Sequence, residues 1–221
     1  MTEQHFAAAA PTTNWKKFIL QLVVGAIAGA GAMFLALTLF DGIGGATLAG
    51  DAILAIGVGV VYLLMGILVG LGVAFPKPGA TMLNVEDESE IREQKGLFGS
   101  SALGCILIGA SALVLVAATP TFALVTPVTG AILFALCLAG SIAAGVVSRR
   151  ATDEFGQQLG TESNATFLAL FALVFGLWAA LAHLGLAPMF SGLAFYAGSL
   201  ALYLLAVFWV VGRRGLLAPR G

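Results

Sequence analysis

Charged side chains are scarce in this chain of 221 residues: only 10% of the residues are Asp, Glu, Lys or Arg, whereas 60% are hydrophobic. A water-soluble domain carries about 25% charged residues, so this chain lacks the polar surface that a globule in water requires. The formal net charge is −1, which provides no positive field for nucleic acid. The composition therefore excludes a soluble globule and a nucleic-acid-binding protein. It predicts a membrane protein that is surrounded by lipid.

Cysteine and histidine are also scarce, with two of each in the chain. Cys105 and Cys137 fall in different apolar segments, and at about 1.5 Å per residue their depths in a membrane differ by about 10 Å, too far for a disulfide. Their spacing also excludes a Cys-x-x-Cys zinc or redox motif. His183 stands alone in its apolar segment, so it supplies neither two haem ligands nor a metal-binding set. We predict no metal site, leave any cofactor unknown, and expect a polar contact for His183, either a hydrogen bond or contact with a ligand.

Asp, Glu, Lys and Arg are missing from the interior of every long apolar segment. Catalysis inside a membrane normally needs such side chains facing the interior of a helix bundle, and a driven transporter needs one for its proton or ion. A nucleophile with an adjacent base cannot be recognised either. We therefore expect no catalytic residues and a protein that is not an enzyme.

Six long apolar segments are what the chain does contain. They are 15–40, 52–75, 101–118, 128–148, 166–185 and 192–212. Each is close to the roughly 20 residues that cross a bilayer as a helix, and none shows the alternating pattern of a β-barrel strand. The sequence predicts an all-α polytopic membrane protein with a bundle of six transmembrane helices over 15–212. Tails at 1–14 and 213–221 and connections at 76–100 and 149–165 complete the predicted organisation.

The basic residues are distributed on one side of such a bundle. All ten Lys and Arg lie at the start of the first segment, between the second and third, after the fourth, or after the sixth. Because Lys and Arg near spans are retained in the cytoplasm, we predict that both termini are cytoplasmic. This topology is that of a multi-pass protein in a cell membrane, and we expect the bacterial cytoplasmic membrane.

The two longer cytoplasmic connections carry the acidic residues. Asn84 is a predicted N-cap for a short interfacial helix, in which Glu88 and Arg92 form an i,i+4 pair. Thr152 stands before two acidic residues in a similar arrangement, at the start of a second predicted helix. These segments are either solvated linkers or a docking surface for a cytoplasmic partner.

Small residues form a stripe on the first apolar segment. Gly25, Ala28, Gly29 and Ala32 recur at i, i+3, i+4 and i+7, which places them on one face of a helix. In lipid, such small faces allow helix backbones to approach closely. We expect this face to pack tightly against a partner helix, either of this chain or of a different subunit.

Two functions remain after these exclusions. The first is an accessory or structural subunit that packs against partner helices in a larger membrane complex. The alternative is a small-solute transporter or a substrate-binding transporter subunit. In size, number of spans and small-residue first helix, the predicted architecture resembles the substrate-binding components of energy-coupling-factor transporters. This resemblance implies binding of a small solute.

Overall fold

The computed structural model describes residues 15–44, 48–83, 85 and 87–216, and this part of the chain contains helices and no strands. The helices are α1 Trp15–Gly44, α2 Gly50–Ala74, α3 Pro76–Leu83, α4 Glu88–Glu93, α5 Lys95–Ala117, α6 Pro127–Ala151, α7 Glu154–His183 and α8 Gly192–Arg213. The predicted N-terminal tail, the predicted cap Asn84 and positions 217–221 lie outside the described residues.

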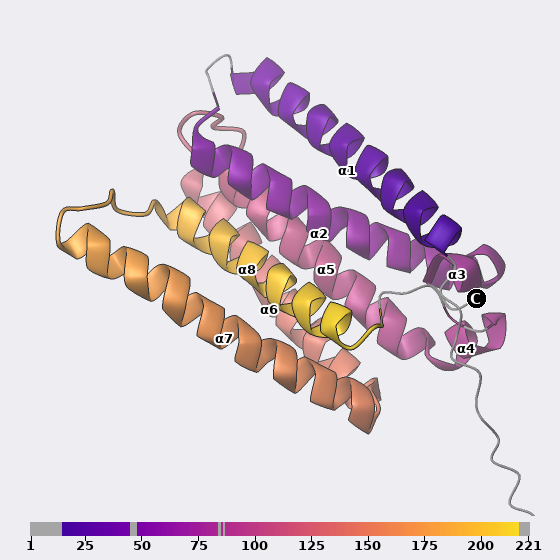
Figure 1. Ribbon diagram of the computed structural model, residues 1–221. Helices are drawn as coiled ribbons and strands as arrows, with labels where there is room; N and C mark the ends of the chain where they lie inside the picture. The colour runs from indigo at the N-terminus through magenta and orange to yellow at the C-terminus, as the bar shows by residue number, and fades with distance from the viewer. Residues whose placement is uncertain (1–14, 45–47, 84, 86, 217–221) are drawn as a thin grey trace, which may run out of the picture.

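The long helices run back and forth along one common direction (Figure 1). The start of α1 and the end of α8 therefore lie at the same end of the bundle, as an even number of crossings requires. α2 and α5 form the centre: α1 and α8 pack on α2, α6 packs on α5, and α7 packs on α8. The connections between them are short, apart from the segment that holds α3 and α4.

Length and apolarity make the long helices membrane spans. α2, α5, α6, α7 and α8 are 22 to 30 residues long, with mean hydropathies of 2.0 to 2.7 over their most apolar stretches, and α1 contains a further apolar stretch at Gly25–Phe40. Large apolar side chains such as Leu136 and Trp209 are 63% exposed on the outside of the bundle, as a lipid-facing surface requires. The chain is a polytopic helical membrane protein, which confirms the fold class predicted from composition.

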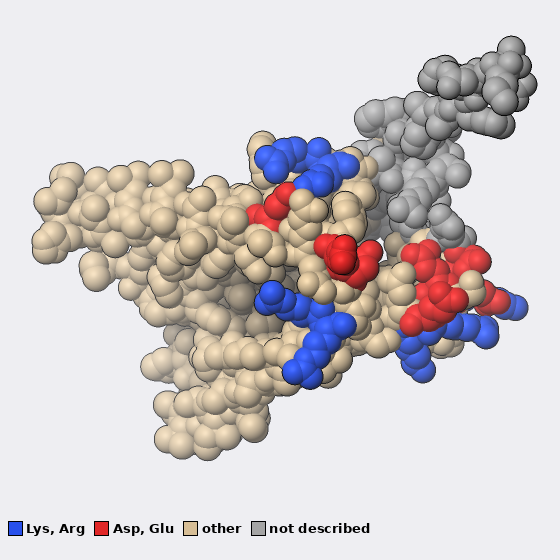
Figure 2. All heavy atoms as spheres, turned by 90° about the horizontal axis from the view of Figure 1, so that it is seen from below, with Lys and Arg blue, Asp and Glu red and all other residues tan. Residues whose placement is uncertain are grey.

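Charged side chains gather at one end of the bundle (Figure 2). They come from α4, from the start of α5 and α7, and from the ends of α6 and α8. The opposite end is free of them in this view. This distribution is the one expected if that end faces the cytoplasm. We call it the charged end below.

Close packing within the chain is concentrated between α2 and α5. A Cβ added to Gly109 would lie 2.6 Å from the backbone oxygen of Gly59, and one added to Gly66 would lie 2.7 Å from the oxygen of Ala102. No side chain fits at either glycine without displacing the facing helix. Small residues therefore let these two central helices approach at backbone distance.

The helices at the charged end differ from the predicted connections. α6 and α7 continue through most of 149–165, leaving only Thr152 and Asp153 between them. Asp153, and not Thr152, caps α7 by accepting from the amide of Gly156, while Thr152 ends α6. The helix predicted at the acidic residues after Thr152 is therefore the polar start of α7, which runs without a break into the apolar span predicted from residue 166. At about 1.5 Å per residue the 30 residues of α7 span about 45 Å.

The segment between α2 and α5 contains the predicted interfacial helix in shorter form. α4 is capped by Asp87, whose side chain accepts from the amides of Ser89 and Glu90. The predicted pair of Glu88 and Arg92 is present at 3.6 Å. α3, which precedes α4, was not predicted; it contains Pro and Gly, which are unfavourable in a helix interior.

Candidate functional site: a polar cavity at the charged end

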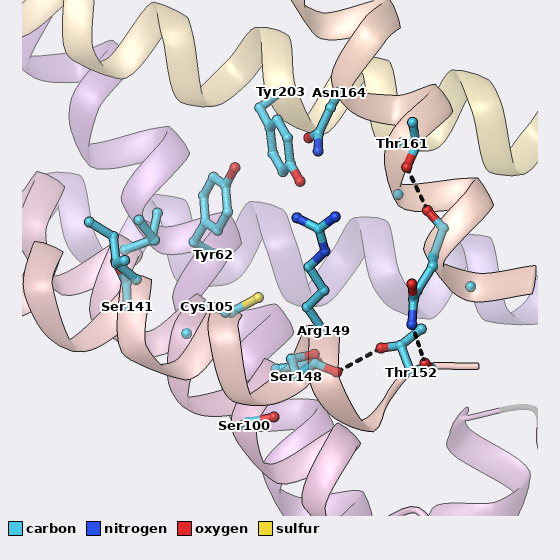
Figure 3. Close-up of a pocket in the computed structure, with 18 of the residues that line it drawn as sticks. Tyr62, Ser100, Cys105, Ser141, Ser148, Arg149, Thr152, Thr161, Asn164 and Tyr203 are labelled. Atoms are coloured by element: carbon cyan, nitrogen blue, oxygen red, sulfur yellow. Dashed lines mark hydrogen bonds between the residues drawn. The ribbon is translucent and has the colours of Figure 1, made fainter. Parts of the chain in front are cut away.

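A cavity of about 720 Å³ lies between α5, α6, α7 and α8, on the charged side of the bundle (Figure 3). α2 contributes Tyr62 and α8 contributes Tyr203. The remaining lining residues are Ser100, Ser101, Gly104, Cys105 and Ile108 from α5; Leu138, Ser141, Ile142, Gly145, Ser148 and Arg149 from α6, followed by Thr152; and Gly156, Gln157, Gly160, Thr161 and Asn164 from α7. Most of them are polar or small.

Helix packing explains why this space stays open. α6 is held by α5 and α7 is held by α8, while α6 and α7 scarcely touch each other. Small residues widen the space further: a Cβ added to Gly145 or to Gly160 meets nothing within 4 Å. The cavity is thus a gap between two helix pairs, and it is kept wide by glycine.

Hydrogen bonds fix the walls of the cavity. The hydroxyls of Ser101 and Ser148 lie 2.9 Å apart and join α5 to α6. Thr152 donates to the backbone oxygen of Ser148 at 2.7 Å, and Gln157 donates to that of Thr152 at 3.0 Å. These bonds tie the start of α7 to the end of α6, so the floor of the cavity is a connected polar surface.

Among the described residues that line the cavity, Arg149 alone is formally charged. Its guanidinium is directed toward the side chains of Asn164 and Tyr203 (Figure 3), and within the described ranges no ion pair joins it to an acid. By contrast, Arg213 and Arg214 both pair with Glu162. The cavity therefore presents a cation with five unpaired donors, together with neutral groups that donate or accept. Chemically, this arrangement is suited to holding an anionic group.

The predicted stripe on α1 is packed at its C-terminal end and exposed at its N-terminal end. Ala32 packs, together with its neighbour Met33, against a cluster of buried residues that come from α2, α5, α8 and the turn after α5. Farther back along α1, Gly25 and Ala28 are exposed, and a Cβ added to Gly25 or Gly29 meets nothing within 4 Å. The described residues thus leave the first part of the stripe uncovered, and its packing against a partner remains a prediction.

His183 lies far from the cavity. It is the last residue of α7, at the end of the bundle opposite Arg149, and its side chain is exposed. No hydrogen bond of its imidazole occurs within the described part of the chain, so the expected polar contact remains a prediction. Both cysteines are free, as predicted from their depths, and Cys105 is part of the cavity wall.

Sequence reasoning missed the cavity, although a signal for it exists. On α6 and at its C-cap, the small and polar residues Ser141, Gly145, Ser148 and Thr152 recur at helical spacing, and α5 and α7 carry similar stripes toward the same end. A single stripe of this kind is read as a packing face. Three stripes that converge at one end of neighbouring spans indicate a polar cavity.

Comparison of the chain with protein-family models, with curated proteins and with solved structures finds no match. Function must therefore be argued from the geometry of this chain.

Proposed function

We propose that this protein is an accessory or structural subunit of a larger membrane complex, and that α1 is the helix that meets its partner. The observation that supports this proposal is the uncovered first part of the stripe on α1. α1 packs on α2, and the side chains that reach the central cluster come from Ala32 onward. A second transmembrane helix could lie against Gly25, Ala28 and Gly29 without displacing any described residue.

The physical reason is the balance of forces between helices in lipid. Burial of apolar surface drives soluble helices together, but lipid tails are as apolar as leucine, so helices associate in a membrane through close contacts and hydrogen bonds. A face of glycine and alanine offers lipid little contact area, while it allows a partner backbone to approach and gain dispersion contacts. An uncovered small-residue face is therefore more stable against another helix than against lipid.

The experiment is mild detergent extraction followed by purification of the tagged full chain. A membrane protein that remains with it in stoichiometric amount is the expected result. Gly29→Leu should release that protein, because leucine pushes the facing helix away. Gly31→Leu is the matched control: Gly31 is on the same helix, has open space around an added Cβ, and lies outside the stripe. If both variants keep the partner, or if the wild-type chain purifies alone, the proposal is wrong.

We also propose the finer location of the protein, the bacterial cytoplasmic membrane with the charged end in the cytoplasm. The one-sided distribution of Lys and Arg supports this orientation.

A small-solute transporter or a substrate-binding transporter subunit is the second candidate. The cavity beside Arg149 favours it, because pockets for small molecules typically have volumes of about 300 to 1,000 Å³ and this one measures about 720 Å³. A monodisperse monomer that binds a water-soluble solute would favour this candidate over the first.

A further inference from the structure

We propose that the cavity binds the headgroup of an anionic phospholipid, and that Arg149 contacts the lipid phosphate. This proposal concerns the far side of the bundle from α1 and does not depend on the proposed subunit role. It rests on the charge of the cavity, on the direction of the Arg149 side chain, and on the way the cavity opens toward the membrane.

The charge of the cavity is positive and uncompensated. Arg149 lines it, whereas no Asp or Glu does among the described residues around it. Elsewhere at the charged end, two carboxylates pair with other cations: Glu162 pairs with Arg213 and Arg214, and Glu88 pairs with Arg92. A guanidinium presents a planar set of donors that matches two phosphate oxygens at once. An anion is thus the ligand that would complete the site.

The Arg149 side chain is exposed and points toward other residues that line the cavity. Side chains on a helix lean toward its N-terminus, and α6 reaches the charged end at its C-terminus. The side chain of Arg149 therefore leans back toward the membrane, and Figure 3 shows its guanidinium directed at Asn164 and Tyr203. A phosphate at this position would also have the Asn164 amide as a neutral donor.

The level of the cavity along the bundle is that of lipid headgroups. Asn164 is two residues beyond Glu162, whose carboxylate pairs with the arginines at the end of α8. The predicted apolar span of α7 begins at Thr166. Asn164 and Arg149 therefore lie at the boundary between the charged end and the hydrocarbon, where phospholipid phosphates are found.

The cavity also opens toward lipid and becomes apolar with depth. Ile142 belongs both to the cavity wall and to the outer surface of α6, where it is 61% exposed. Leu138, one turn deeper on α6, and Ile108 on α5 continue the apolar wall. A phospholipid could place its phosphate beside Arg149 and its acyl chains along Ile142 and Leu138. The acyl chains would then pass out of the cavity between α6 and α7, which scarcely touch each other. A soluble phosphate compound would use only the polar half of this space.

The experiment measures binding to the purified full chain by isothermal titration calorimetry in detergent. The probes are dihexanoyl phosphatidylglycerol, dihexanoyl phosphatidylcholine, glycerol 3-phosphate and inorganic phosphate. We expect the anionic lipid to bind more tightly than the other three. Arg149→Gln should weaken its binding about tenfold or more, as loss of a charge-assisted pair predicts, and Arg149→Lys should restore part of it.

Two matched controls separate a local site from general effects. Arg150 is adjacent, carries the same charge and does not line the cavity, so Arg150→Gln should leave binding unchanged. Gly160→Leu should fill the cavity and abolish binding without unfolding the protein, because the added side chain enters open space, whereas Gly176→Leu on the same helix, where space is also open, should have no effect. These variants keep the test decisive if Arg149→Gln folds poorly.

Three results would overturn the proposal. Equal affinity for the two lipids would show that the site does not distinguish an anionic headgroup from a zwitterionic one. Equal losses for Arg149→Gln and Arg150→Gln would indicate general attraction to a basic surface. Inorganic phosphate or glycerol 3-phosphate binding as tightly as the anionic lipid, with the same dependence on Arg149, would identify a site for a soluble anion instead.

Discussion

The hydroxyl of Tyr62 on α2 donates a hydrogen bond to the backbone oxygen of Leu200 on α8, at 3.2 Å and across 138 positions of the chain. Tyr62 is only 5% exposed, so this bond lies inside the bundle beside the cavity. It fixes α8, and with it the α7 that packs on α8, to the central helix. The bond thereby attaches α7, one wall of the cavity, to the centre of the bundle through α8.

Removal of this hydroxyl should loosen the bundle slightly. Hydrogen bonds between membrane helices contribute about 0.6 kcal/mol on average, so Tyr62→Phe should lower the midpoint of thermal unfolding in detergent by a small, measurable amount. Tyr203→Phe is the control, because Tyr203 makes no hydrogen bond to a described residue and is 37% exposed. An equal loss for both variants would contradict the assigned role of the Tyr62 bond.

A methyl group between α2 and α5 should be far more disruptive. At Gly109 an added Cβ would approach the backbone of Gly59 to 2.6 Å, which neither helix can relieve without moving. Overpacking of this kind costs about 1 to 3 kcal/mol, so Gly109→Ala should unfold at a clearly lower temperature than wild type. Gly99→Ala on the same helix meets open space and should leave stability unchanged or raise it. A stable Gly109→Ala protein would mean that α2 and α5 are not in backbone contact.

The topology follows from one-sided charge and can be measured in intact cells. A cysteine placed at Thr121, in the exposed turn between α5 and α6, should react with a membrane-impermeant maleimide added from outside. A cysteine placed at Gln158, on the exposed first turns of α7, should react only after the cells are opened. The unsubstituted chain supplies the background from Cys105 and Cys137. Labelling of position 158 in intact cells would reverse the orientation.

Acid should weaken the cap of α4. The Ser89 hydroxyl and then the Glu90 amide donate to the Asp87 carboxylate and hold its pKa below the ordinary 3.8. Because the folded pKa is the lower one, the stabilising contribution is complete above the ordinary value and is lost as the pH falls through the folded value. Hydrogen exchange at the Glu90 amide should therefore lose protection at acidic pH, relative to Asp87→Asn, whose side chain still accepts but does not titrate there. Identical pH profiles for the two proteins would refute this role of Asp87.

The spans were predictable because exposing polar groups to lipid is costly, so each span must be a long apolar segment of the sequence. Lengths, order and common direction all follow from that constraint. The polar turns of α7 were predicted on a different ground, the pattern of a cap followed by acidic residues at 152–154, because lipid imposes nothing on Glu154 or Gln157. Their unbroken continuation into the apolar span was not predicted. The cavity was harder still. Arg149 and Arg150 are indistinguishable in sequence, and only the packing of α7 on α8 rather than on α6 decides which of them faces an open space.

Photocrosslinking from α1 in native membranes tests the central claim most directly, because no detergent intervenes. A benzoylphenylalanine placed at Ala28 lies on the stripe, and one placed at Ile27 lies on the opposite side of α1, where the side chain is 68% exposed. The subunit account predicts that the probe at Ala28 crosslinks to a discrete second membrane protein and that the probe at Ile27 crosslinks only to lipid. If both probes crosslink only to lipid or to this chain itself, α1 has no partner and the account is contradicted.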